Sequence, residues 1–284
     1  MDKVVKFFTV SDWGKSLKIL LLFNLGLRLI GVMSYYLLPS RFAPLDFIAP
    51  IFQSNFLFWA FANFDGEHYL SIAKYGYQFR GGFPQYAFFP LLPLLINLLA
   101  YLVRDYYVSG MIITQLALWI ALVYLSRWVK LLGIKDLRIS LLLTTGSVFL
   151  ASIYTEPVFI ALAVLTMYFS EKKWWGRAVL TTALATATRV NGVFLAGFLF
   201  IKLLQSKKSL TSSLSYLLAS FSGLIAYMTF LYFKTGDALA WFHSQGAWGK
   251  ATATSPLTTA TSYFKAVTYE FTPDFVHYVV VIEV

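Results

Sequence analysis

Long apolar segments separated by short polar stretches constrain this chain more than any other feature of its sequence. Only 13% of the 284 residues are charged and 58% are hydrophobic, whereas a soluble domain usually carries about 25% charged residues. Such a chain cannot cover its surface with polar groups, so a lipid bilayer must solvate much of it. The composition therefore excludes an ordinary soluble fold.

Clusters of basic residues indicate how the apolar segments are oriented. The net charge is +10, and the lysines and arginines gather in short stretches at 3–18, 127–138, 172–177 and 202–208. Cytoplasmic loops of membrane proteins carry such an excess, and a nucleic-acid surface does not require this spacing. We therefore predict a multi-pass membrane protein of the plasma or endoplasmic reticulum membrane, with membrane lipids and no nucleic acid as partners.

The basic clusters fall on one side of the membrane only if residues 87–103 do not cross it. This short segment contains Pro90 and Pro93, so we predict an interfacial helix within an outer loop of residues 39–105. We predict transmembrane helices at about 16–38, 107–126, 139–153, 157–170, 175–188, 193–204 and 210–233.

The predicted fold class is all-α: one polytopic transmembrane helical bundle over residues 1–284, with a helical extracytoplasmic first loop at the membrane interface. The last apolar stretch runs from Phe275 to Val284 and ends before it is long enough to span a bilayer. We therefore expect the chain to be incomplete at its C-terminus.

The outer loop holds the first group of residues that can do chemistry. Asp65, Glu67 and His68 lie within four residues, among apolar and aromatic side chains. A carboxylate near a membrane interface is partly desolvated and becomes a stronger base, as transfer of a sugar to a hydroxyl requires. Asp65 is therefore either a general base or the cap of the helix that follows it.

Three other charged residues also have two interpretations. Glu156 either caps a helix that starts near Pro157 or binds a sugar. Arg189 interrupts an apolar run, so it either pairs with Glu156 or stabilises a departing phosphate. Arg28 lies well inside the first predicted helix, where it either pairs with a carboxylate or supports a donor phosphate.

Tryptophans and histidines complete the set of candidates. Trp241 and Trp248 suit either stacking on sugar rings or anchoring at the membrane interface. The chain has three histidines, far apart in sequence, and no cysteine, so we predict no metal site and no disulfide.

Four ordered motifs resemble those of the PIG-V family of membrane mannosyltransferases, which belongs to the GT-C superfamily. The first runs from Asp65 through His68 to Tyr77 and continues with Ala-Phe-Phe-Pro-Leu-x-Pro-Leu from residue 87. The other three are Tyr-Thr-Glu-Pro-Val-Phe at 154–159, Arg-Val-Asn-Gly at 189–192, and Phe-His-Ser-Gln-Gly-Ala-Trp at 242–248. Phe64 departs from the family, which usually has tryptophan before the first aspartate.

The resemblance implies an inverting transfer of mannose from polyprenyl-phosphate-mannose on the extracytoplasmic face, with Asp65 as general base. It implies a glycolipid, glycan or protein as acceptor, and no cofactor besides the donor substrate. The candidate donor-binding residues are Glu67, His68, Glu156, Arg189, Asn191, Gln245 and Trp248.

Two other classes of protein remain open from the sequence. A transporter or lipid flippase would place polar residues in an aqueous cavity and break helices in paired positions, and the interruption at 189–192 is one such break. The chain shows no internal repeat of the kind that many transporters have. In a structural membrane subunit, the loop motifs would be incidental.

Overall fold

The described part of the chain is almost entirely helical. The computed structural model describes residues 11–37, 60–80, 83–144 and 146–248. Its only strands within these ranges are β1 (Phe79–Arg80) and β2 (Phe83–Pro84), which pair antiparallel. The prediction of an all-α fold is confirmed. Part of the outer loop and the apolar stretch from Phe275 lie outside the described residues.

Among the described residues, two helices are each long and apolar enough to cross a membrane: α2 (Asp12–Leu37) and α6 (Tyr106–Leu131). They occupy the ranges predicted at 16–38 and 107–126, although α6 extends further into the basic segment. α2 exposes a row of leucines, of which Leu22 is 59% exposed. Exposed leucine in such a helix suits a lipid environment.

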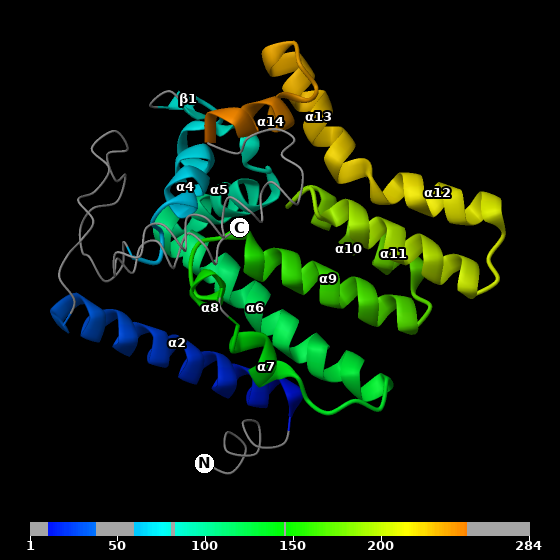
Figure 1. Cartoon of the computed structure of the whole chain (residues 1–284), viewed down its shortest axis with the longest axis horizontal. Coiled ribbons are helices and arrows are strands. Elements are labelled where there is room, and N and C mark those ends of the chain that lie inside the picture. Colours follow the sequence, from blue (N-terminus) through cyan, green and yellow to red (C-terminus); the bar gives the residue numbers. More distant parts are fainter. Residues whose placement is uncertain (1–10, 38–59, 81–82, 145, 249–284) are drawn as a thin grey trace, which may run out of the picture.

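Three further helices extend the array from α6: α9 (Thr155–Glu171) packs on α6, α10 (Trp175–Thr186) packs on α9, and α11 (Gly192–Gln205) packs on α10. Figure 1 shows them side by side. The hydroxyl groups of Thr166 and Thr181 lie 2.8 Å apart between α9 and α10, so buried polar groups satisfy each other within the array.

The helix predicted at 139–153 is wrong, because the structure has two short helices there, α7 (Arg138–Leu142) and α8 (Ser147–Leu150). The Ser147 hydroxyl donates to the Leu142 carbonyl oxygen at 2.7 Å and accepts from the Thr144 amide at 3.2 Å. A side chain that bonds nearby backbone groups competes with the hydrogen bonds of a helix. The apolar run is therefore interrupted.

The single helix predicted at 210–233 is also wrong, since α12 (Leu210–Ser220) and α13 (Ser222–Thr235) meet at a bend of 46°. The Thr186 hydroxyl of α10 donates to the Ser220 carbonyl oxygen at 3.1 Å and accepts from the Leu224 amide at 3.3 Å. These two backbone groups would bond each other in a continuous helix. An inserted side chain of this kind bends a helix.

The remaining elements gather at one end of the array (Figure 1). They are α4 (Asp65–Tyr75), η1 (Gln85–Ala87), α5 (Leu91–Val103), α14 (Ala240–His243) and η2 (Ser244–Trp248). α5 begins four residues after the start of the interfacial segment predicted at 87–103. It packs on α4, where the Asn97 amide donates to the Ala73 carbonyl oxygen at 2.6 Å.

The two ends of the array differ in their residues. At the basic end, where α2 begins and α6, α9 and α11 end, Lys130 pairs with Asp12 at 2.6 Å and Lys202 pairs with Glu171 at 2.7 Å. At the motif end, α4, α9 and α11 begin and α10 ends. The first three sequence motifs lie at this end.

Candidate active site

The loop before α4 is fixed to the segment before α9. The Ile153 amide donates to the Phe61 carbonyl oxygen at 2.8 Å, and the Tyr154 hydroxyl donates to the Asn63 carbonyl oxygen at 3.0 Å. A Cβ atom on Gly66 would lie 3.2 Å from the Ile153 carbonyl oxygen. These contacts bring Asp65, the first residue of α4, beside the start of α9.

Of the three candidate residues Asp65, Glu67 and His68, only one is exposed. Phe64 adopts φ 54° and ψ −118°, a backbone conformation that a non-glycine residue rarely takes and that often occurs at functional sites. Asp65, which follows it, is exposed. Glu67 is 7% and His68 only 2% exposed. Of the three, Asp65 is therefore the group that a substrate can reach.

Glu156 and Arg189 form an ion pair across the motif end. Glu156 lies in the first turn of α9, and Arg189 lies in the break between α10 and α11. The ion pair named as one alternative for Arg189 is therefore confirmed. The second carboxylate oxygen of Glu156, Oε2, is buried and has no hydrogen-bond partner among the described residues. A buried acceptor of this kind favours a ligand that donates to it.

The charges of Asp65, Glu156 and Arg189 act on one another. Burial lowers the pKa of Arg189, but the Glu156 carboxylate, with smaller contributions from Tyr69 and Asp65, outweighs this and raises it. Burial also raises the pKa of Tyr69, and the charge of Asp65 adds to that effect, whereas Thr155 and Arg189 oppose it. The first three motifs therefore meet in one electrostatically coupled site.

Tyr69 also belongs to this site, and it was not among the predicted site residues. It lies four residues after Asp65 in α4, and residues with this spacing share one face of a helix. This four-residue spacing from Asp65 is the sequence feature that could have predicted Tyr69 as a site residue. Because its pKa is raised, the phenol stays protonated at neutral pH and keeps its capacity to donate a hydrogen bond.

A glycine shapes the break that carries Arg189. A Cβ atom on Gly192 would lie 2.6 Å from the backbone of Ala185 and Thr186, so α11 contacts α10 directly. Asn191 precedes α11 and is exposed, and its side chain does not cap the helix. Its predicted role in donor binding stays a prediction.

His68 and Trp248 lie together in an aromatic cluster. The His68 ring stacks on Phe88 with centroids 4.9 Å apart and meets the Trp248 ring edge-on at 4.8 Å. The Trp248 indole donates to the Pro84 carbonyl oxygen at 3.1 Å. This packing joins the fourth motif to the first loop, and it favours a positioning role for both side chains over contact with the donor.

The other candidates have local partners. Gln245 donates to the carbonyl oxygen of Trp241 at 3.3 Å. Arg28 donates to the Asn24 side chain at 2.8 Å, and its guanidinium lies 4.6 Å from the centre of the Phe61 ring. Within the part of the chain that the structure describes, Arg28 pairs with no carboxylate, and no group of three potential metal-ligating side chains occurs.

Comparison with known proteins supports the resemblance. The profile of the family described as "Mannosyltransferase (PIG-V)" matches residues 2–234. The human protein named GPI alpha-1,6-mannosyltransferase 2 is 29% identical over 178 residues, which cover 57% of this chain and 35% of the human protein. The rat protein of the same name is 28% identical over 179 residues, covering 57% of this chain and 35% of the rat protein.

This chain thus spans about a third of the length of the curated relatives that it matches. No solved structure matches it significantly. The family profile nevertheless covers most of the chain, including the segments that carry Asp65, Glu156 and Arg189. The chain belongs to the PIG-V mannosyltransferase family.

Proposed function

We propose that this chain carries the active site of a membrane mannosyltransferase that uses polyprenyl-phosphate-mannose on the extracytoplasmic face and inverts the anomeric centre. The observation that carries the proposal is the meeting of Asp65, Glu156 and Arg189 at the motif end. An exposed carboxylate next to a partly buried cation provides a base for the acceptor and a positive charge for the leaving group.

Asp65 serves as the general base. The acceptor hydroxyl oxygen attacks the anomeric carbon of mannose while its proton passes to the Asp65 carboxylate. The bond from the anomeric carbon to the phosphate oxygen breaks, and its electron pair leaves with the polyprenyl phosphate. Because Asp65 is exposed at the start of α4, both substrates can approach it.

Arg189 stabilises the departing phosphate. Its side chain is 37% exposed, so part of the guanidinium stays available while the ion pair with Glu156 fixes its position. A positioned cation at the site where negative charge develops is among the strongest catalytic contributions. The Glu156 carboxylate, whose side chain is 26% exposed, then accepts a hydrogen bond from a mannose hydroxyl.

A glycolipid is the acceptor that the comparisons favour. The curated relatives are named GPI alpha-1,6-mannosyltransferase 2, and a GPI precursor is a glycolipid. We therefore propose a glycolipid acceptor in place of the glycan or protein that the motifs alone leave open.

A transfer assay with purified full-length protein in proteoliposomes tests the proposal. The protein should transfer labelled mannose from polyprenyl-phosphate-mannose to a glycolipid acceptor, and Asp65→Asn should reduce the rate by about 10²–10⁴-fold. Asp105→Asn is the matched control, because Asp105 caps α6 at the same end of the array and asparagine caps about equally well. Full activity of Asp65→Asn would exclude this residue as the base, and lipid translocation without mannose transfer would indicate a flippase.

A further inference from the structure

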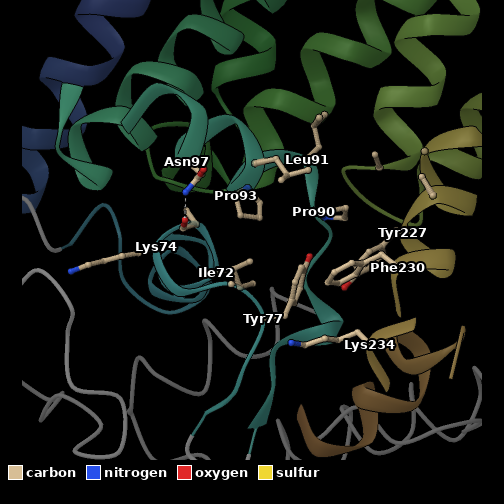
Figure 2. A pocket seen from close by; sticks show the side chains of 16 residues that line it. Ile72, Lys74, Tyr77, Pro90, Leu91, Pro93, Asn97, Tyr227, Phe230 and Lys234 are labelled. Carbon is tan, nitrogen blue, oxygen red and sulfur yellow. Dashed lines mark hydrogen bonds between the residues drawn. The ribbon is translucent and has the colours of Figure 1, made fainter. Parts of the chain in front are cut away.

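A cavity of about 630 Å³ lies beside the candidate active site. Its walls come from the last turn of α4, the start of α5, the end of α10 and one face of α13 (Figure 2). Cavities that bind small ligands usually have about 300–1,000 Å³. This one therefore has the size of a binding site.

Direct contacts join the four walls pair by pair. Asn97 of α5 donates to the Ala73 carbonyl oxygen of α4 at 2.6 Å, and the Leu91 amide donates to the Ala187 carbonyl oxygen at 3.0 Å. A Cβ atom on Gly223 would overlap the backbone of α10, so α13 packs directly on that helix. The cavity is therefore formed before any ligand enters it.

The protein already satisfies the two tyrosine hydroxyls of the wall. The Tyr77 hydroxyl donates to the Phe88 carbonyl oxygen at 2.7 Å, and the Tyr227 hydroxyl donates to the Tyr86 carbonyl oxygen at the same distance. The aromatic rings of both residues line the cavity (Figure 2). A sugar needs several hydrogen-bond partners, whereas a hydrocarbon chain needs none. The wall therefore suits a hydrocarbon chain.

Two lysines add positive charge to the lining of this apolar cavity. Lys74 lies in the last turn of α4 and Lys234 in the last turn of α13, and both are exposed. Lysines next to an apolar surface attract the anionic headgroup of a lipid whose chain the surface buries. The cavity thus combines the two features that an anionic lipid requires.

The distance from Asp65 decides which substrate this lipid is. Asp65 does not line the cavity, and the lining residue Lys74 lies nine residues after it in α4, about 13.5 Å along the helix. In the donor, the phosphate is bonded directly to the transferred sugar, so it must lie next to the base. A glycolipid acceptor differs, because sugar units separate its phosphate from the hydroxyl that reacts.

We infer that the cavity binds a hydrocarbon chain of a phosphate-bearing glycolipid acceptor, with its phosphate next to the amine of Lys234. This inference rests on the proposed mannosyl transfer and assigns its acceptor a location. The glycan of the bound lipid extends from the lysines along α4 towards Asp65.

Photocrosslinking tests the site independently of catalysis. The probe is a phosphatidylinositol with a diazirine in its acyl chain, in phosphatidylcholine vesicles that contain the full-length protein. Label should appear on peptides from α5 and α13. Ala226→Trp fills the cavity and should lower labelling about tenfold, the effect of losing about two buried methylene groups. Ile225→Trp, at the neighbouring exposed position outside the lining, should label like the wild type.

The headgroup is tested by charge removal. Lys234→Gln should lower labelling by phosphatidylinositol about fivefold and leave labelling by a phosphatidylcholine probe unchanged. Lys208→Gln, beyond the end of α11 at the basic end, is the control and should change neither.

Three outcomes would overturn the inference. One is equal labelling of Ala226→Trp and the wild type, and the second is labelling of the cavity by a photoreactive polyprenyl phosphate instead of phosphatidylinositol. The third is mannose transfer by Ala226→Trp with an unchanged KM for the acceptor, which would leave the proposed function standing. Absence of transfer by the wild type would instead reject the proposed function, while the crosslinks report on the cavity separately.

Discussion

Two ion pairs join the same regions of the bundle at opposite ends, and within the described ranges only one of them leaves a buried polar atom without a partner. At the motif end, Glu156 in the first turn of α9 pairs with Arg189 just before α11. At the basic end, Glu171 closes α9 and pairs with Lys202 in the last turn of α11 at 2.7 Å. Both glutamates are 26% exposed.

The difference lies in the surroundings of each pair. Among the described residues, Oε2 of Glu156 is buried without a partner, and Arg189 also interacts with the charge of Asp65. The pair of Glu171 and Lys202 has no buried polar atom without a hydrogen-bond partner among the described residues, and it lies among the basic clusters. Similar exposure and chemistry therefore do not imply a similar role. In the described part of the chain, the motif end keeps a carboxylate oxygen without a hydrogen-bond partner, and this favours a ligand there.

Of the substitutions in the two ion pairs, the largest effect should come from replacing the two cations, one at a time. Arg189→Gln should lower the rate of mannose transfer by about 10²–10³-fold, because the departing phosphate loses its positive partner. Lys202→Gln should leave the rate close to that of the wild type. Initial rates in proteoliposomes measure both. Equal losses in the two variants would show that both ion pairs are structural.

Removing the two carboxylates should produce a smaller difference. Glu156→Gln replaces an ionised acceptor that binds a sugar hydroxyl, a hydrogen bond worth about 1.5–3 kcal/mol. We expect kcat/KM for the donor to fall about 10–100-fold. Glu171→Gln should change it little. A donor kcat/KM that is insensitive to Glu156→Gln would remove this residue from the sugar site.

Two glycines of α11 allow the packing at the motif end to be tested by stability. Gly192→Ala would push a Cβ atom into the backbone of α10, so it should destabilise the protein by about 1–3 kcal/mol. A Cβ atom added at Gly197 would have no atom from elsewhere in the described chain within 4 Å. Gly197→Ala should therefore stabilise the protein by about 0.5–1 kcal/mol, because it lowers the conformational entropy of the unfolded chain. Denaturant unfolding in detergent measures both, and a neutral Gly192→Ala would contradict the close contact.

The last effect is expected at the basic end and depends on pH. Burial raises the pKa of Asp136, but its hydrogen bonds and ion pair with Arg138 outweigh this and hold the pKa below its usual value of 3.8. The stabilisation is therefore present above pH 3.8 and is lost as the pH falls through the lower folded-state value. Asp136→Asn should cost about 1–3 kcal/mol at neutral pH, because it removes the counter-charge of the Arg138 guanidinium, which is only 6% exposed. Unfolding at several pH values should show the difference from wild type disappearing in acid.

Much of the helical array was predictable from apolar runs and basic clusters. α2, α6 and α9 lie where long apolar segments predicted them, and the break at 189–192 separates α10 from α11 as expected. The ion pair of Glu156 and Arg189 was also predictable as an alternative, because an arginine in an apolar run needs a partner.

The remaining features depend on contacts between residues far apart in sequence. Thr186 bends α12 and α13 from a different helix, and His68 is buried partly because Trp248 packs against it. The hydrophobic periodicity of a sequence describes one segment at a time, so it could not predict either of these contacts between segments. The interruption before α8 is local, and it involves the hydrogen bond of a single serine hydroxyl. The hydrophobicity of the segment gives no information about that bond.

The Thr186 hydroxyl also sets how far α12 and α13 reach. Residues 210–235 in one straight helix would extend about 39 Å, longer than the hydrocarbon core of about 30 Å. Because the bend redirects α13, this length need not be accommodated by tilt alone or by thickening of the surrounding bilayer. The two hydrogen bonds to one hydroxyl on α10 thus accompany a bend that shortens the end-to-end reach of residues 210–235.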